Sequence, residues 1–217
     1  MTAMYDNFAK DFSESRKNMK WWEIDYFLQF IKDADVACSL LDVWCGNGRL
    51  LESISDSEIT LSNYLWVDNS VWLLEQAKEL HPDHHFQHLD MKDIGDVKQT
   101  YDFIFFIASF HHLESIEDRE NVLLSAYNLL NPGGRICMTN WALDSDINKE
   151  KYFKNMEEGS ENIFGSTDYH IKFWKFERYY HCFSLKELEN ISHCSGFTVE
   201  ENRLFENQKN FVTILRK

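Results

Sequence analysis

Glycine and proline are scarce in this chain of 217 residues, which contains 8 Gly and 2 Pro. Average usage would give about 15 Gly in a chain of this length. Tryptophan, usually the rarest residue, reaches 7. So little Gly and Pro, beside 44% hydrophobic residues, excludes a disordered or collagen-like chain. The length predicts a single domain over residues 1–217.

Positive charge is also in short supply. The chain has 22 Lys and Arg against 36 Asp and Glu, which gives a formal net charge of −14. Phosphate binding depends on Lys and Arg, so this balance argues against a general basic surface for nucleic acid. A local basic patch or a basic partner subunit stays compatible with it.

Metal-binding and membrane patterns are missing as well. The 5 Cys form no CxxC pair and no zinc-ligand spacing, so we expect no metal. Without a secretory signal they indicate reduced thiols in a cytoplasmic protein. The most apolar run, 103–110, is too short to span a membrane. A histidine cluster fits no standard metal site, and we predict that it is a solvated surface: His81, His84, His85 and His88.

Apolar strand-like runs alternate with helical patterns along the chain. The runs cover 36–44, 63–68, 85–89, 101–109 and 135–141, and a final pair, 197–205 and 210–217, indicates a hairpin. We therefore predict an α/β, Rossmann-like, doubly wound and mostly parallel seven-stranded sheet with a C-terminal antiparallel hairpin.

Two segments flank this alternating pattern. Residues 1–34 show a helical period over 4–34 and predict an N-terminal helical cap. Residues 142–182 are polar and aromatic, and predict an irregular insertion on the substrate side, over the C-terminal edge of the sheet. Helices are expected at 70–80, with Ser70 as the N-cap, and at 184–194.

The strand ends carry the candidate ligand-binding residues, because ligands bind beyond the carboxyl ends of such strands. The Gly-containing turn 45–48 lets backbone approach a ligand at the start of a helix. Asp68 and Asp90 end the second and third strands, where acids can face a ribose and an adenine. A dinucleotide site would need a third Gly in this turn. Taken alone, each acid is more often a solvated carboxylate.

These residues together resemble the class I S-adenosylmethionine (SAM)-dependent methyltransferases. The matches are Asp42 with the turn 45–48, then Asp68, then Asp90 with Met91, then the run 101–113 and the segment LLNPGG at 129–134. The resemblance implies SAM as cofactor, S-adenosylhomocysteine as product, and no metal. The residues that it implies for the cofactor are Tyr5, Arg16, Asp42, Trp44, Cys45, Gly46, Asn47, Gly48, Asp68, Asn69, Asp90, Met91 and Ile107.

A narrower resemblance points to the tRNA wobble-uridine methyltransferases, which esterify a carboxymethyl group and include the methyltransferase domain of AlkB homologues. It rests on Phe12, Ser13, Arg16 and Trp21, on the motif RYYHCF at 178–183, and on HHL at 111–113 and TNW at 139–141. The implied acceptor is a carboxylate. An ionised carboxylate needs no general base, so orientation carries much of the rate.

This resemblance supplies the candidate residues for the acceptor. Arg178 would hold the substrate carboxylate or a phosphate, and His111 and His112 would face the transferring methyl. Tyr179 completes the candidate catalytic set. Trp141, Tyr180 and His181 are the candidate substrate-binding residues. The alternative is structural, with the tyrosines packing the insertion and Arg178 pairing with an acid.

The net charge bears on the partner. A tRNA partner is disfavoured by a charge of −14 unless a basic patch or a small activator subunit supplies cations. The candidate patch consists of Lys17, Lys20, Lys172, Lys175, Arg178 and Arg203. A second interpretation is a small-molecule carboxyl, O- or N-methyltransferase on the same fold.

Trp44 raises a third interpretation. It stands where the resembled family has the first glycine of its cofactor loop, so an indole there predicts an obstructed SAM pocket and an impaired enzyme. Trp66 and Trp72 also stand at positions where that family often has glycine, and Trp22 adjoins the matched Trp21. We hypothesise that some of these codons are UGA, read as glycine in the native host.

Overall fold

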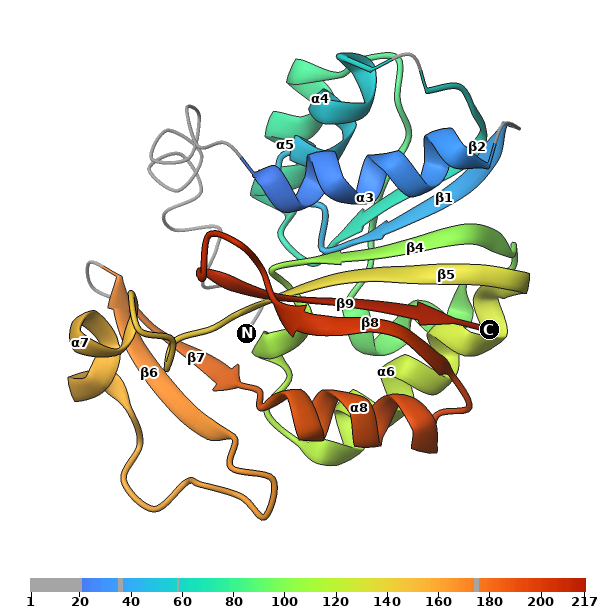
Figure 1. Ribbon diagram of the computed structural model, residues 1–217. Helices are drawn as coiled ribbons and strands as arrows, with labels where there is room; N and C mark the ends of the chain where they lie inside the picture. The colour runs from blue at the N-terminus through green and yellow to red at the C-terminus, as the bar shows by residue number, and fades with distance from the viewer. Residues whose placement is uncertain (1–20, 35–36, 58, 174–175) are drawn as a thin grey trace.

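The computed structural model describes residues 21–34, 37–57, 59–173 and 176–217 (Figure 1). The predictions for Tyr5, Phe12, Ser13, Arg16, Lys17, Lys20 and Lys175 lie outside these residues. None of the helices that are described is long and apolar enough to cross a membrane.

A seven-stranded sheet forms the centre of the molecule, as predicted. Its order is β3-β2-β1-β4-β5-β9-β8. The bounds are β1 (Cys38–Val43), β2 (Leu61–Asp68), β3 (Phe86–His88), β4 (Tyr101–Ile107), β5 (Leu130–Trp141), β8 (Thr198–Leu204) and β9 (Asn210–Arg216). β1 to β5 pair in parallel, whereas β9 is antiparallel to both β5 and β8.

Helices cover both faces of the sheet (Figure 1). One face carries α3 (Trp22–Asp33), α4 (Arg49–Ser55) and α5 (Val71–Leu80), and the other carries α6 (Ile116–Leu129), α8 (Leu185–Cys194) and the short helix η1 (Met91–Asp96). Successive strand residues point to opposite faces, so Leu40 and Phe105 enter one core and Leu41 and Phe106 the other. This double burial explains the nearly continuous apolar runs of the inner strands.

Serine N-caps set the starts of three helices. The hydroxyl oxygens of Ser70, Ser115 and Ser184 accept hydrogen bonds from backbone N–H groups in the first turns of α5, α6 and α8. Each satisfies a donor that has no partner within its helix, which is typically worth about 1 kcal/mol. The predicted cap at Ser70 is confirmed.

The insertion is more regular than predicted. After α7 (Lys149–Tyr152) and η3 (Phe153–Asn155), the strands β6 (Thr167–Phe173) and β7 (Phe176–Cys182) form an antiparallel hairpin outside the main sheet (Figure 1). Polar and charged side chains, including Asp168 and His181, occupy one face of this hairpin. β6 therefore alternates apolar with polar residues, a strand pattern that the prediction of an irregular insertion overlooked. Residues 131–134 of the LLNPGG segment lie within β5, at a register shift against β4.

Candidate functional site

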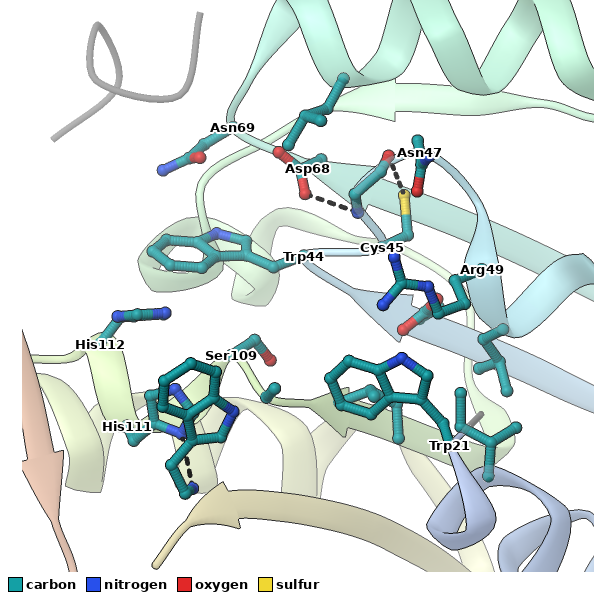
Figure 2. Close-up of a pocket in the computed structure, with 18 of the residues that line it drawn as sticks. Trp21, Trp44, Cys45, Asn47, Arg49, Asp68, Asn69, Ser109, His111 and His112 are labelled. Carbon is teal, nitrogen blue, oxygen red and sulfur yellow. Dashed lines mark hydrogen bonds between the residues drawn. The ribbon is translucent and has the colours of Figure 1, made fainter. Parts of the chain in front are cut away.

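A cleft opens at the C-terminal ends of β1, β2 and β4 (Figure 2). The chain runs outward from β1 to β3 on one side and from β4 to β5 on the other, so the strand order reverses here. The lining residues are Trp21, Ile24, Asp42, Trp44, Cys45, Gly46, Asn47, Arg49, Leu50, Asp68, Asn69, Leu73, Ile107, Ala108, Ser109, His111, His112, Trp141, Arg178 and Tyr180.

The turn between β1 and α4 brings backbone to the cleft wall. Gly46 and Gly48 have φ of +59° and +88°, which L side chains rarely adopt. A Cβ atom at Gly48 would lie 2.9 Å from Cδ2 of His81, whereas one at Gly46 would meet nothing within 4 Å. Gly48 therefore packs against α5, and Gly46 leaves open space in the cleft.

Asp68 is anchored beside this turn. Its Oδ2 accepts from the Gly46 amide at 2.8 Å, and its Oδ1 accepts from the Ser70 amide at 2.8 Å. The carboxylate is buried and lines the cleft. A carboxylate at this position is of the kind that accepts hydrogen bonds from ligand hydroxyl groups.

Asp42 lies deeper in the same cleft. It is buried, and its Oδ1 makes no hydrogen bond within the part of the chain that the structure describes. Burial and the neighbouring charge of Asp68 hold the pKa of Asp42 well above its usual range. A ligand group that donates a hydrogen bond or carries positive charge would satisfy this oxygen.

Asp90 and Met91 do not line the cleft. Oδ1 of Asp90 accepts from the Lys92 amide at 3.0 Å and so caps η1, while Oδ2 accepts from Asn69 Nδ2 at 2.9 Å. Met91 is fully buried in the core beneath α6. Asn69, which was predicted among the cofactor residues, does line the cleft.

Trp44 occupies the turn with an unusual backbone. Its φ is +62°, which is a left-handed conformation. This conformation costs most L residues about 1–2 kcal/mol, and glycine adopts it readily. Its indole packs against the same core cluster as Met91 and lies 5.8 Å, centroid to centroid, from the His112 ring. The backbone of position 44 is therefore one that glycine would adopt without strain.

The opposite wall begins with two histidines on η2 (Phe110–His112). His111 is buried, and its Nδ1 accepts from the Trp141 amide at 3.3 Å. Burial, followed by the nearby positive charges of Arg178 and His181, lowers the pKa of His111 to about 3. His111 is therefore a neutral imidazole at pH 7.

His112 links this wall to β7. Its Nδ1 lies 2.9 Å from the carbonyl oxygen of Tyr179, and its Nε2 lies 3.1 Å from Nη2 of Arg178. A carbonyl only accepts and a guanidinium only donates, so the proton of the ring is on Nδ1. Arg178 is buried and lies over the Tyr180 ring at 5.1 Å, and Tyr180 stacks on Trp141 at 5.0 Å. The wall is a set of aromatic rings around one guanidinium.

Tyr179 and His181 lie on the other face of β7, because side chains alternate along a strand. The His181 ring nitrogens lie 2.6 Å from Asp168 and 2.9 Å from Glu187. The Tyr179 hydroxyl donates to Asp168 at 2.7 Å. This pair was expected at the substrate, but the structure places it behind the cleft wall.

Arg119 completes what we call the rear network, namely Arg119, Asp168, Tyr179, His181 and Glu187. Arg119 contacts Glu187 at 3.3 Å and donates to the Tyr179 hydroxyl at 3.0 Å. Burial alone would raise the pKa of Glu187, but hydrogen bonding to His181 and its charge lower it to about 2. Asp168 also has a lowered pKa, through His181 and Tyr179 against the opposing effect of burial. The rear network joins the hairpin to α6 and α8.

The cleft lining also includes seven residues that were not among the predicted site residues, namely Trp21, Ile24, Arg49, Leu50, Leu73, Ala108 and Ser109. Trp21 lies under the Arg49 guanidinium at 5.1 Å, and the Ser109 hydroxyl donates to the Val43 carbonyl at 3.0 Å. Arg49 begins α4 directly after the glycine turn, and Ser109 follows β4 closely. Their positions at strand ends were the available signal.

Three residues of the predicted basic patch, Lys172, Arg178 and Arg203, lie within the described ranges. Arg178 is buried in the cleft wall, Arg203 pairs with Glu201 and Glu206, and Lys172 lies on the hairpin face that carries Asp168. Within the histidine cluster, His84 packs on Tyr64 at 4.9 Å, and Nε2 of His88 lies 3.1 Å from the Asn69 carbonyl oxygen. No group of metal-ligating side chains is found in the described ranges.

The chain is similar in sequence to curated methyltransferases and in fold to solved structures. A stretch of 155 residues is 30% identical to a tRNA (carboxymethyluridine(34)-5-O)-methyltransferase of Saccharomyces cerevisiae and covers 71% of this chain and 52% of that protein. A Schizosaccharomyces pombe protein of the same name is 23% identical over 92% of this chain and 89% of its own length. The chain spans about half of the first relative and nearly all of the second.

Solved structures share the fold. A SAM-dependent methyltransferase from Clostridium acetobutylicum superposes with a TM-score of 0.70 at 13% identity, covering 98% of both chains. A Burkholderia thailandensis 1,6-didemethyltoxoflavin-N1-methyltransferase with bound S-adenosylhomocysteine gives 0.68 at 14% identity, covering 100% of this chain and 86% of that one. The family model described as "Methyltransferase domain" matches residues 8–202. The chain therefore belongs to the methyltransferase domain family.

Proposed function

We propose that this enzyme transfers the methyl group of SAM to the carboxylate of a carboxymethyl group on a tRNA wobble uridine. The observation that carries the proposal is the acceptor wall, where the buried Arg178 guanidinium lies over Tyr180 and beside two histidines. Such a wall offers a cation for an anionic acceptor, and His111 is held neutral. The names of the yeast relatives agree with this acceptor.

The residues of the donor side suit the cofactor. Asp68 would accept ribose hydroxyls, Asn69 would lie against the nucleoside, and the Gly46 turn would let backbone approach. The unsatisfied Oδ1 of Asp42 suits a hydrogen-bond donor or the ammonium of the methionine part. SAM supplies an activated methyl group when bound. Trp44 is the one residue in this wall that opposes the fit.

The main task of the protein in this reaction is to orient the donor and the acceptor. A carboxylate is ionised at neutral pH and needs no base. Arg178 would hold the two carboxylate oxygens through its guanidinium, and His112, fixed in one tautomer, would orient Arg178. Alignment of donor and acceptor then accounts for much of the acceleration.

Features near the cleft suit a nucleotide acceptor. The stacked pair of Trp141 and Tyr180 offers an aromatic surface to a planar base. The Tyr152 ring lies 6.3 Å from Trp141, and α7 and η3 around it expose three lysines, Lys149, Lys151 and Lys154. Lys151 and Lys154 would give RNA phosphates a place to bind next to the cleft, whereas Lys149 pairs with Asp146. We also propose that a small activator subunit adds positive charge and that the enzyme acts in the cytoplasm.

A small-molecule carboxylate is the second candidate. The observation in its favour is the net charge of −14, with 36 acidic residues that repel RNA. A molecule of the size of a nucleoside would meet Arg178 and Tyr180 without meeting the rest of the acidic surface.

Methyl incorporation separates the two candidates. Three acceptors are compared with labelled SAM: tRNA that carries carboxymethyluridine, the same tRNA without that group, and free carboxymethyluridine. We expect label only in the first, released by mild base as an ester would be. No incorporation into the modified tRNA, with or without a cell extract that supplies a partner, would overturn the proposal. Label in the free nucleoside alone would favour the second candidate.

A further inference from the structure

We infer that the indole of Trp44 is an internal occupant of the donor pocket, which competes with the cofactor and sets its affinity. The inference rests on the proposed role of this cleft as the SAM site. It goes beyond that role because it assigns to one side chain the control of donor binding.

The first support is the backbone. Within the described ranges, only three residues other than glycine have positive φ: Trp44, Ala108 and Gln208. Of these, Trp44 is by far the largest, and bulky residues are the least suited to this region. Strain of this kind persists only where the surroundings hold it, and it gathers at ligand sites. The packing around the indole must therefore supply the stabilisation that keeps position 44 in this conformation.

The second support is the environment of the indole. Trp44 lines the cleft and packs against the hydrophobic core cluster beneath α6. Its Nε1 is buried and makes no hydrogen bond to any described residue. An indole N–H that is buried usually finds a partner. The ring is held by packing against apolar side chains and the His112 ring, and a better-fitting ligand can replace such contacts.

The third support is the position of the ring between the two walls. Figure 2 shows the indole between Asn69 on the donor side and His112 on the acceptor side. The methyl group must pass from the donor wall to the acceptor wall, so a bound donor has to reach across this gap. The indole and a productively bound donor cannot both occupy it. Binding must therefore displace the ring, and the affinity is lowered by the contacts that the ring gives up.

Calorimetry with S-adenosylhomocysteine tests the inference without turnover. We expect Trp44→Gly and Trp44→Ala to bind this ligand at least about 10-fold more tightly than the wild type. The alanine variant keeps the left-handed strain and removes only the bulk, so a gain in both variants identifies the ring as the obstacle. Gln208→Gly is the matched control, because it relieves left-handed strain in the β8–β9 turn, away from the cleft lining. Its affinity should equal that of the wild type.

Fluorescence gives an independent readout. Displacement of a buried indole changes its emission, so titration of the wild type with S-adenosylhomocysteine should change the signal more than titration of Trp44→Phe. Equal affinities in wild type, Trp44→Gly and Trp44→Ala would overturn the inference and leave the donor site intact. A failure of all three to bind would overturn the donor site itself. Loss of tRNA methylation by variants that bind tightly would bear only on the acceptor.

Discussion

The two faces of β7 differ sharply although they come from one run of four residues. On the cleft face, Arg178 and Tyr180 meet aromatic rings and a neutral histidine. On the rear face, Tyr179 and His181 meet two carboxylates and Arg119. The cleft face holds chemistry that an anionic substrate needs, and the rear face holds charges that satisfy one another. Strand alternation alone therefore separates the residues of the motif that line the cleft from those that anchor the hairpin.

The strongest test of this division is Glu187→Ala. Glu187 is fully buried and bonded to His181 and Asn162. Removing one partner of a buried charged network leaves the others uncompensated, at a cost of about 3–5 kcal/mol. We expect urea unfolding to show a loss of this size. The control is Glu189→Ala on the same helix, an exposed residue 3.9 Å from His193, which should change stability by less than about 0.5 kcal/mol.

Acid should weaken the rear face next. The folded-state pKa of Glu187 is about 2, below its ordinary value of 4.5, so its contribution is complete above pH 4.5. That contribution is lost as the pH falls through about 2. His111 acts in the same direction between pH 6.5 and about 3, because the unfolded chain binds its proton and the folded one does not. Melting curves from pH 7 to 2 should show a falling Tm, with a smaller fall below pH 4.5 in Glu187→Gln.

The cleft face should respond in activity instead. Arg178→Lys keeps the charge but loses the planar fork, so we expect kcat/KM on carboxymethyluridine tRNA to fall about 10- to 100-fold. A lysine in this wall that supports full activity would contradict the assignment of Arg178. The measurement is paired with a melting curve, because a fall in activity without a fall in folded fraction separates this face from the rear one.

Tyr179→Phe should have the smallest effect. It removes a hydroxyl that bonds to Asp168 and Arg119, at a cost of about 1 kcal/mol in stability. We expect kcat/KM within twofold of the wild type. The prediction from the motif that Tyr179 is catalytic requires instead a fall of at least about 10-fold with little change in Tm, so a single kinetic assay decides between them.

The sheet could be predicted because its signals are local. Buried parallel strands give continuous apolar runs, and the serine before α5 marks the start of that helix. The rear network could not be predicted, because partners such as Glu187 and Arg119 lie 68 residues apart in the sequence. No local pattern reveals which distant acid neutralises which base.

The cleft could be predicted in its donor half and less so in its acceptor half. Asp68, Gly46 and Asp42 stand at strand ends and reach the cleft. The sequence alone does not show which residues of the motif at 178–181 face the cleft, because this depends on the register of the hairpin. Asp90 was predicted at the ligand, and in the structure its side chain caps η1. This cap could not be predicted, because the sequence did not indicate the short helix η1.

Recoding of tryptophan codons stays a prediction. Position 44 has the backbone of a glycine, Trp66 is fully buried beside Tyr64, and Trp72 is about half exposed on α5. The gene decides: UGG at positions 44, 66 and 72 would refute it.

The pairing of β6 with β7 also limits how the length of this segment can change. Arg178 faces Ile171 across the hairpin, and Tyr179 faces His170. Inserting or deleting one residue within β7 would turn every later side chain to the opposite face. The guanidinium would then enter the rear network and the imidazole of His181 would enter the cleft, so both would fail together. Relatives of this chain should therefore tolerate substitutions in β7 but keep its length.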